Sequence, residues 1–193
     1  MTLSVCVYCG SRFGDDPAFE RVARQLGASL GARRGQLVYG GGRVGLMGAV
    51  ADASLAAGAR VVGVIPQALM DREVGHPGLS ELHVVQTMHE RKQLMAERAD
   101  AFVALPGGIG TLEELYEVWS WQQLGYHDKP VALLNVDGYY DELLAFMRTG
   151  HRRGFVSDAQ HGALIVDDDV ERLLDRLAAA GAKATAPDDY SRI

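Results

Sequence analysis

The chain has 193 residues, of which 48% are hydrophobic and 23% charged, and its formal net charge is −6. This length indicates one domain with a sizeable core. The acidic balance excludes the broad cationic surface of a nucleic-acid-binding protein, although it is compatible with a local basic pocket for a small anion.

The N-terminal segment has no feature of export or membrane insertion. No apolar run reaches the ~18 residues of a membrane-spanning helix. Residues 1–8 lack a basic region and continue directly into a strand-like pattern, which predicts a cytoplasmic protein. Cys6 and Cys9 lie in that strand and point to opposite faces, so we predict a structural role and neither a disulfide nor a metal site.

Short β-branched runs alternate with longer amphipathic segments. A first helix opens at Pro17, and Gly35 marks its end. Several strands are apolar almost throughout, which is typical of a parallel sheet covered on both faces. The predicted strands are Leu3–Cys9, Gln36–Tyr39, Arg60–Ile65, Leu82–Gln86, Ala101–Leu105, Val131–Asn135 and Leu164–Val166. The other predicted helices are Val44–Ala57, His89–Arg98, Thr111–Leu124, Tyr139–Arg152 and Val170–Ala180.

This order predicts an α/β fold, a doubly wound and mainly parallel sheet with helices on both faces. We expect a single domain over residues 1–181. Residues 182–193 have no hydrophobic pattern and are expected to form a loose tail. Ligands of such sheets bind at the carboxyl ends of the strands, so the loops there are the candidate site.

The first glycine-rich loop, Gly40–Gly48, follows the second strand and opens a helix. Gly40, Gly42 and Gly45 match G-x-G-x-x-G. A dinucleotide site also requires an acidic residue at the end of the next strand, where this chain has Ile65-Pro66-Gln67. We therefore expect neither NAD nor FAD to bind.

The second loop, Pro106–Thr111, also joins a strand to a helix. Glycines let backbone N–H groups approach a ligand closely, and the helix N-terminus adds partial positive charge. Two such turns at the same edge of a sheet predict a phosphate-bearing ligand. Neither loop contains G-K-[ST], so a nucleoside-triphosphate P-loop is not indicated.

Charged residues flank the second loop. Arg91 and Lys92 lie near a helix start, where cations are unfavourable, so they indicate either a nearby anion or simple exposure to solvent. The segment His-Glu-x-x-Gln from His89 lacks the second histidine of a zinc protease. Thr111 and Glu114 fit a T-x-x-E capping box, so Glu114 is either a helix cap or a site carboxylate.

Three of these segments together resemble one family. Gly40–Gly48 is similar to its GGGxxGLMG element, Pro106–Glu114 to its PGGxGTxxE signature, and His89–Lys92 to its (H)xRK segment. The family is the Lonely Guy family of cytokinin riboside 5′-monophosphate phosphoribohydrolases, historically mislabelled as lysine decarboxylases. The resemblance extends from Val5–Ser11 to about Val166.

The resemblance implies a Rossmann-like fold and hydrolysis of the N-glycosidic bond of an adenosine 5′-monophosphate, without cofactor or metal. Arg91 and Glu114 match the catalytic pair, with Arg91 on the phosphate or on the departing base. The family is commonly dimeric, and the aromatic helix Leu112–Leu124 is compatible with a partner helix. The expected substrate-binding residues are Gly10, Ser11, Gly41, Gly42, Gly45, Met47, Glu73, Lys92, Gly108, Ile109, Gly110 and Thr111.

Two other functions remain as alternatives: an AMP nucleosidase without preference at N6, and a nucleotide-binding protein without turnover. The presence of both Arg91 and Glu114 favours turnover. Decarboxylase chemistry is disfavoured because pyridoxal phosphate requires a lysine, and only Lys92, Lys129 and Lys183 are available.

Overall fold

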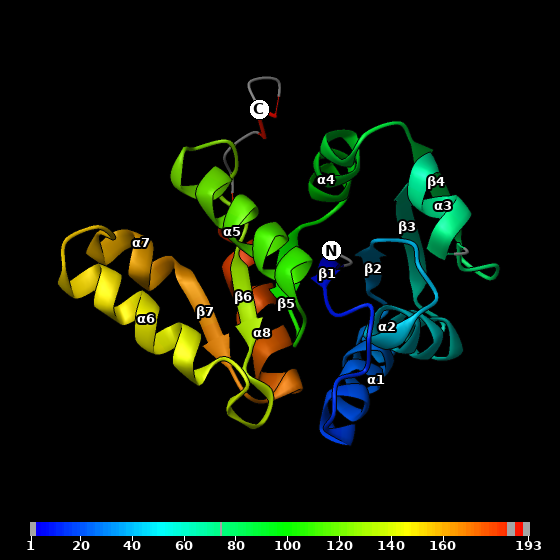
Figure 1. The fold of residues 1–193 in the computed structure, drawn as a ribbon, viewed down its shortest axis with the longest axis horizontal. Coiled ribbons are helices and arrows are strands. Elements are labelled where there is room, and N and C mark those ends of the chain that lie inside the picture. The colour runs from blue at the N-terminus through cyan, green and yellow to red at the C-terminus, as the bar shows by residue number, and fades with distance from the viewer. Residues whose placement is uncertain (1–2, 74, 185–187, 191–193) are drawn as a thin grey trace.

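The computed structural model describes residues 3–73, 75–184 and 188–190, without the side chains of residues 71–73. Within these residues, seven parallel strands form one sheet in the order β4-β3-β2-β1-β5-β6-β7 (Figure 1). The strands are β1 (Ser4–Tyr8), β2 (Gln36–Tyr39), β3 (Arg60–Pro66), β4 (Glu81–Val85), β5 (Ala101–Ala104), β6 (Val131–Leu134) and β7 (Leu164–Asp167). The predicted doubly wound α/β fold is confirmed.

The strand order reverses once, between β1 and β5. The chain first builds outward from β1 to β4, then returns to place β5 on the other side of β1, paired from Val5↔Ala101 to Tyr8↔Ala104. The segments that follow β1 and β5 therefore leave neighbouring strand ends in opposite directions. Such a switch point opens a crevice at the carboxyl edge of the sheet.

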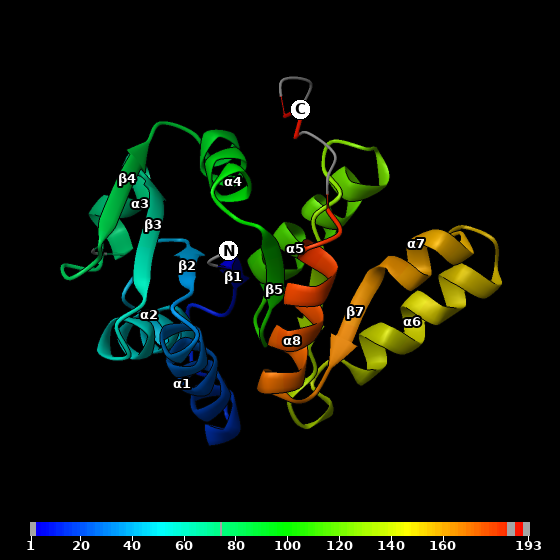
Figure 2. The ribbon, with the colours of Figure 1, turned by 180° about the vertical axis from the view of Figure 1, so that it is seen from behind.

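Two helical layers cover the sheet. One core joins a sheet face to α1 (Pro17–Ala32), α2 (Gly45–Ala56) and α8 (Val170–Gly181). The other core contains residues of α4 (Met88–Glu97), α5 (Ile109–Gln123) and α6 (Asp141–Arg152). In Figure 2, α8 lies in front of the sheet and α5 behind it. Cys6 and Cys9 are free, buried and in opposite cores, as their spacing predicts.

Every predicted strand and helix lies within two residues of the observed bounds, except that the first helix ends at Ala32, three residues before Gly35. Short elements were missed. They are α3 (Gln67–Glu73), α7 (Asp158–Ala163) and a 3-10 turn, Val136–Gly138. Each is too short to show a helical repeat of apolar residues, and α3 follows β3 without a loop. None of the helices described is both long and apolar enough to cross a membrane.

Residues 188–190, which belong to the segment expected to form a loose tail, contact the rest of the fold. Tyr190 is 5% exposed and packs against Trp121 of α5, with ring centroids 5.7 Å apart. Lys129 Nζ lies 5.6 Å from the centre of the Tyr190 ring and 2.5 Å from Asp188. One aromatic side chain, an ion pair and a backbone hydrogen bond from Asp189 N to Tyr126 O hold residues 188–190, and a search for periodic apolar residues does not find such contacts.

We predict that Tyr190→Ala lowers the free energy of unfolding by about 3 kcal/mol, the usual cost of truncating a buried aromatic ring. Tyr190→Phe is the matched control, because the Tyr190 hydroxyl is buried without a hydrogen-bond partner in the described structure. Its removal should leave stability unchanged or slightly higher. Urea unfolding followed by tryptophan fluorescence measures both, and equal stability of Tyr190→Ala and wild type would contradict the packed tail.

Candidate active site

The loops that follow β1, β2 and β5 pack against one another at the switch point. Leu46 N donates to Gly10 O at 3.0 Å, and Gly10 N donates to Pro106 O at 3.0 Å. Gly45 adopts φ +57°, and a Cβ there would overlap the backbone of Arg12. Glycines in these loops thus serve close packing of backbone on backbone, and they bring residues far apart in sequence to one edge.

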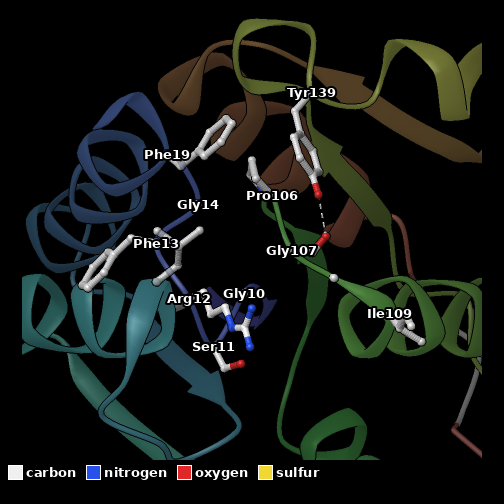
Figure 3. Close-up of a pocket in the computed structure, with 12 residues that line it drawn as sticks. Gly10, Ser11, Arg12, Phe13, Gly14, Phe19, Pro106, Gly107, Ile109 and Tyr139 are labelled. Atoms are coloured by element: carbon white, nitrogen blue, oxygen red, sulfur yellow. Dashed lines mark hydrogen bonds between the residues drawn. The ribbon is translucent and has the colours of Figure 1, made fainter. Parts of the chain in front are cut away.

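A cavity of about 500 Å³ opens between these loops (Figure 3). Four of the residues predicted from sequence line it: Gly10, Ser11, Gly108 and Ile109. The lining residues that sequence analysis did not anticipate include one cationic and three aromatic side chains, those of Arg12, Phe13, Phe19 and Tyr139. Arg91 and Glu114 do not line this cavity.

Two glycines at the start of α5 have no packing role. A Cβ at Gly108 or Gly110 would meet no described atom within 4 Å, and neither residue has a positive φ. Gly108 is the N-cap, and no side chain caps the helix. The first N–H groups of α5 are therefore available to an anion that comes close to the main chain.

The capping-box interpretation of Thr111 and Glu114 is wrong. The helix begins two residues earlier than predicted, at Ile109, so Thr111 is its third residue and Glu114 lies in the second turn. The capping box near the site belongs to α4, where Thr87 accepts from Glu90 N at 3.1 Å. Glu114 consequently has no capping role, and its burial needs another explanation.

Arg91 and Glu114 meet from two different helices. Arg91 is 9% exposed, its Nε donates to Val64 O at 3.1 Å, and its Nη1 lies 3.3 Å from Glu114 Oε1. A Cβ at Gly40 would overlap Arg91 Nη2 and lie 3.5 Å from Met47 Sδ. Gly40 therefore leaves room for the guanidinium group, a function unrelated to its place in G-x-G-x-x-G.

Burial dominates the ionisation of Glu114. The carboxyl group is 8% exposed, and desolvation raises its pKa to about 7. The Arg91 guanidinium opposes that rise, while the neighbouring Glu113 adds to it. Glu114 thus changes its charge near neutral pH, which suits a group that exchanges protons with a substrate or water.

Lys92 lies outside this pair. Its Nζ is 2.6 Å from Glu113 and 2.9 Å from Glu117. Burial lowers the pKa of Lys92, but hydrogen bonds to the two carboxylates outweigh it and raise the pKa. In the described structure, the anionic groups next to Arg91 and Lys92 are therefore glutamate carboxylates of α5. No group of three or more His, Cys, Asp or Glu among the described residues is arranged to hold a metal ion.

The remaining predicted residues lie toward β3 and β4. Gly41 adopts φ +77° and its carbonyl accepts from His76 N at 3.0 Å, while Gly42 forms a β-bridge with Gly75. Both glycines are thereby fixed to the segment that follows α3. Glu73 is the last residue of α3, but its side chain lies outside the described residues.

Sequence analysis missed two adjacent tyrosines between the 3-10 turn that follows β6 and the start of α6. The hydroxyl group of Tyr139 donates to Gly107 O at 2.7 Å, as the dashed line in Figure 3 marks, and that of Tyr140 donates to Leu105 O at 2.6 Å. Their position just after a predicted strand was the available signal. No periodic pattern distinguishes them from ordinary helix-start residues.

Comparison with known proteins decides the family. A model described as "Possible lysine decarboxylase" matches residues 47–177. A probable cytokinin riboside 5′-monophosphate phosphoribohydrolase of Oryza sativa subsp. japonica is 50% identical over 93% of this chain and 78% of its own length. An Arabidopsis thaliana cytokinin riboside 5′-monophosphate phosphoribohydrolase is 50% identical over 90% of this chain and 80% of its own. The chain belongs to the Lonely Guy family. The resemblance seen in the sequence is confirmed.

Solved structures extend the fold beyond the Lonely Guy family. The molybdenum cofactor binding protein of Rippkaea orientalis matches with a TM-score of 0.71 and 20% identity, over 93% of this chain and 97% of that one. The Moco carrier protein of Chlamydomonas reinhardtii also gives 0.71 and 20%, over 95% and 99%. At this identity the likeness establishes a shared architecture only.

We predict that Glu114 makes stability depend on pH. Its native pKa of about 7 exceeds its ordinary 4.5, so the native state gains from the protonated carboxyl below pH 4.5 and loses that gain as pH rises through 7. Relative to Glu114→Gln, wild type should lose about 2–3 kcal/mol of unfolding free energy between pH 5 and pH 8. The difference should level off above pH 8, and a constant difference over the whole range would contradict it.

Proposed function

We propose that the chain hydrolyses the N-glycosidic bond of N6-substituted adenosine 5′-monophosphates, releasing the free base, a cytokinin, and ribose 5-phosphate. The observation that carries this proposal is the buried Arg91–Glu114 pair beside the uncapped start of α5. The two curated relatives, each 50% identical, are named for this activity.

The 5′-phosphate binds at the start of α5 in this proposal. The free N–H groups of the first turn and the open space at Gly108 and Gly110 favour an anion there. Gly10 and Ser11 border the same space from the β1 loop. Phosphate binding at this point positions the ribose, so remote binding energy contributes to orientation of the reacting bond.

Glu114 acts on the ribose. The bond between C1′ and N9 breaks, and its electron pair leaves with the base, which takes up a proton from solvent. The oxocarbenium-like ribosyl cation is stabilised by the Glu114 carboxylate, and water then bonds to C1′ and gives a proton to that carboxylate, which returns it to solvent. Arg91, 3.3 Å away, favours the ionised carboxylate and fixes its orientation.

An assay of base release from AMP and from N6-isopentenyl-AMP tests the proposal. Release from the N6-substituted nucleotide supports it. Release from AMP with no preference for the substituted nucleotide would replace it with a plain AMP nucleosidase. Binding of either nucleotide without any release would reduce the chain to a nucleotide-binding protein.

A homodimer through α5 is part of this proposal. Trp121 is turned inward against the tail, but Tyr116 and Trp119 form a half-buried ring pair, with centroids 5.9 Å apart, on another side of the helix. Aromatic side chains of this kind are enriched in interface cores. The cytoplasmic location and the lack of nucleic-acid or membrane partners stay predictions.

Glu114→Gln should slow base release at least ~100-fold while leaving nucleotide affinity close to wild type. An amide neither accepts the proton of water nor offsets a ribosyl cation. Single-turnover release of base and calorimetric binding measure the two effects. Glu97→Gln, which removes an exposed carboxylate at the end of α4, is the control and should be fully active. Near-normal turnover by folded Glu114→Gln would remove Glu114 from the mechanism.

Gly110→Ala should fold stably and yet bind AMP at least ~10-fold more weakly. Its Cβ meets no described atom and alanine favours a helix, so only a ligand close to the main chain is obstructed. Gly162→Ala in α7, whose Cβ also meets nothing described, is the matched control and should keep its affinity. Unchanged AMP affinity in Gly110→Ala would place the phosphate elsewhere.

A further inference from the structure

The loop between β5 and α5 is held by its carbonyl groups. The carbonyl group of Leu105 accepts a hydrogen bond from Tyr140 Oη at 2.6 Å. That of Pro106 accepts from Gly10 N at 3.0 Å, and that of Gly107 accepts from Tyr139 Oη at 2.7 Å. The next carbonyl, of Gly108, accepts from Leu112 N within the helix. Each peptide plane of the loop is thus oriented by a different donor.

Orienting a carbonyl also orients the N–H group of the same peptide. A trans peptide is planar, so its C=O and N–H point in opposite directions. The Tyr139 hydroxyl holds Gly107 C=O and thereby sends Gly108 N–H out of the loop on the opposite side. Glycine on both sides of this peptide leaves its rotation otherwise weakly restrained.

The two tyrosines differ in what they orient. Tyr140 holds the peptide between Leu105 and Pro106. Because proline has no N–H group, this hydrogen bond orients no hydrogen-bond donor. Tyr139 holds the peptide that does carry a donor, at the N-cap of α5. Adjacent residues therefore make the same type of bond with different consequences.

The turn that presents Tyr139 is strained. Asp137 adopts φ +47° and is followed by Gly138 at φ +73°. The Asn135 side chain fixes the end of the turn by accepting from Tyr140 N at 2.8 Å. A non-glycine residue in the left-handed region costs energy and persists where its surroundings determine it, often beside functional groups.

We propose that Tyr139 is a positioning residue for the phosphate of the substrate. Its hydroxyl fixes the peptide between Gly107 and Gly108, so that Gly108 N–H joins the first turn of α5 as a phosphate donor. The inference rests on the proposed function for the identity of the anion. It adds Tyr139, which contacts the loop between β5 and α5, to the residues that prepare the phosphate site.

Tyr139→Phe removes the hydroxyl and keeps the ring, which packs edge-on against Phe19 and Tyr140. We expect its affinity for ribose 5-phosphate, measured by calorimetry, to fall about threefold to tenfold, the range of one hydrogen bond. Affinity for adenine and the melting temperature should change little, because Tyr139 is 45% exposed. Ribose 5-phosphate needs no turnover, so the measurement is independent of hydrolysis.

Tyr140→Phe is the matched control. Tyr140→Phe should lower the melting temperature, because its partner carbonyl is buried, while keeping wild-type affinity for ribose 5-phosphate. Unchanged affinity in Tyr139→Phe, or equal losses in Tyr139→Phe and Tyr140→Phe, would overturn the proposal. So would wild-type protein that fails to bind ribose 5-phosphate. If the wild type binds ribose 5-phosphate but releases no base from nucleotides, the proposed hydrolase activity is wrong, while the positioning role of Tyr139 still stands.

Discussion

The return of β5 to the side of β1 is the constraint on which the site depends. In a parallel sheet all strands end at one edge, and the single reversal of order separates the loops there. The loops after β1, β2 and β5 close around that opening with backbone-to-backbone contacts, and at Gly45 only glycine permits so close an approach. The uncapped start of α5 lies at the same opening, so one topological feature places the proposed anion site.

The Arg91–Glu114 pair is costly for the fold. Taking both charges out of water carries a desolvation penalty that a single contact at 3.3 Å repays only in part. The same desolvation penalty raises the pKa of Glu114, because burial disfavours its charged form. Hydrophobic residues would fill this space at lower cost, so the pair is better explained by chemistry than by stability.

The fold was accessible from the sequence because buried parallel strands are apolar runs, as in Arg60–Pro66. The residue types of the site were accessible too, but their geometry was not. Arg91 and Glu114 belong to helices whose contact depends on tertiary packing, and no local pattern encodes it. Thr111 and Glu114 imitate a capping box whose register depends on where α5 begins. Tyr139 acts through a carbonyl of a distant loop, and a sequence pattern does not reveal such a bond.

Position 40 has a consequence for interpreting related sequences. The space above its Cα is occupied by the Arg91 guanidinium group, so no side chain at residue 40 coexists with arginine 91 in this pose. A chain that keeps arginine at 91 but carries alanine or serine at 40 must move that guanidinium group from the position seen here. One glycine, outside the signature that carries Glu114, therefore sets how closely the guanidinium group can lie against the loop after β2.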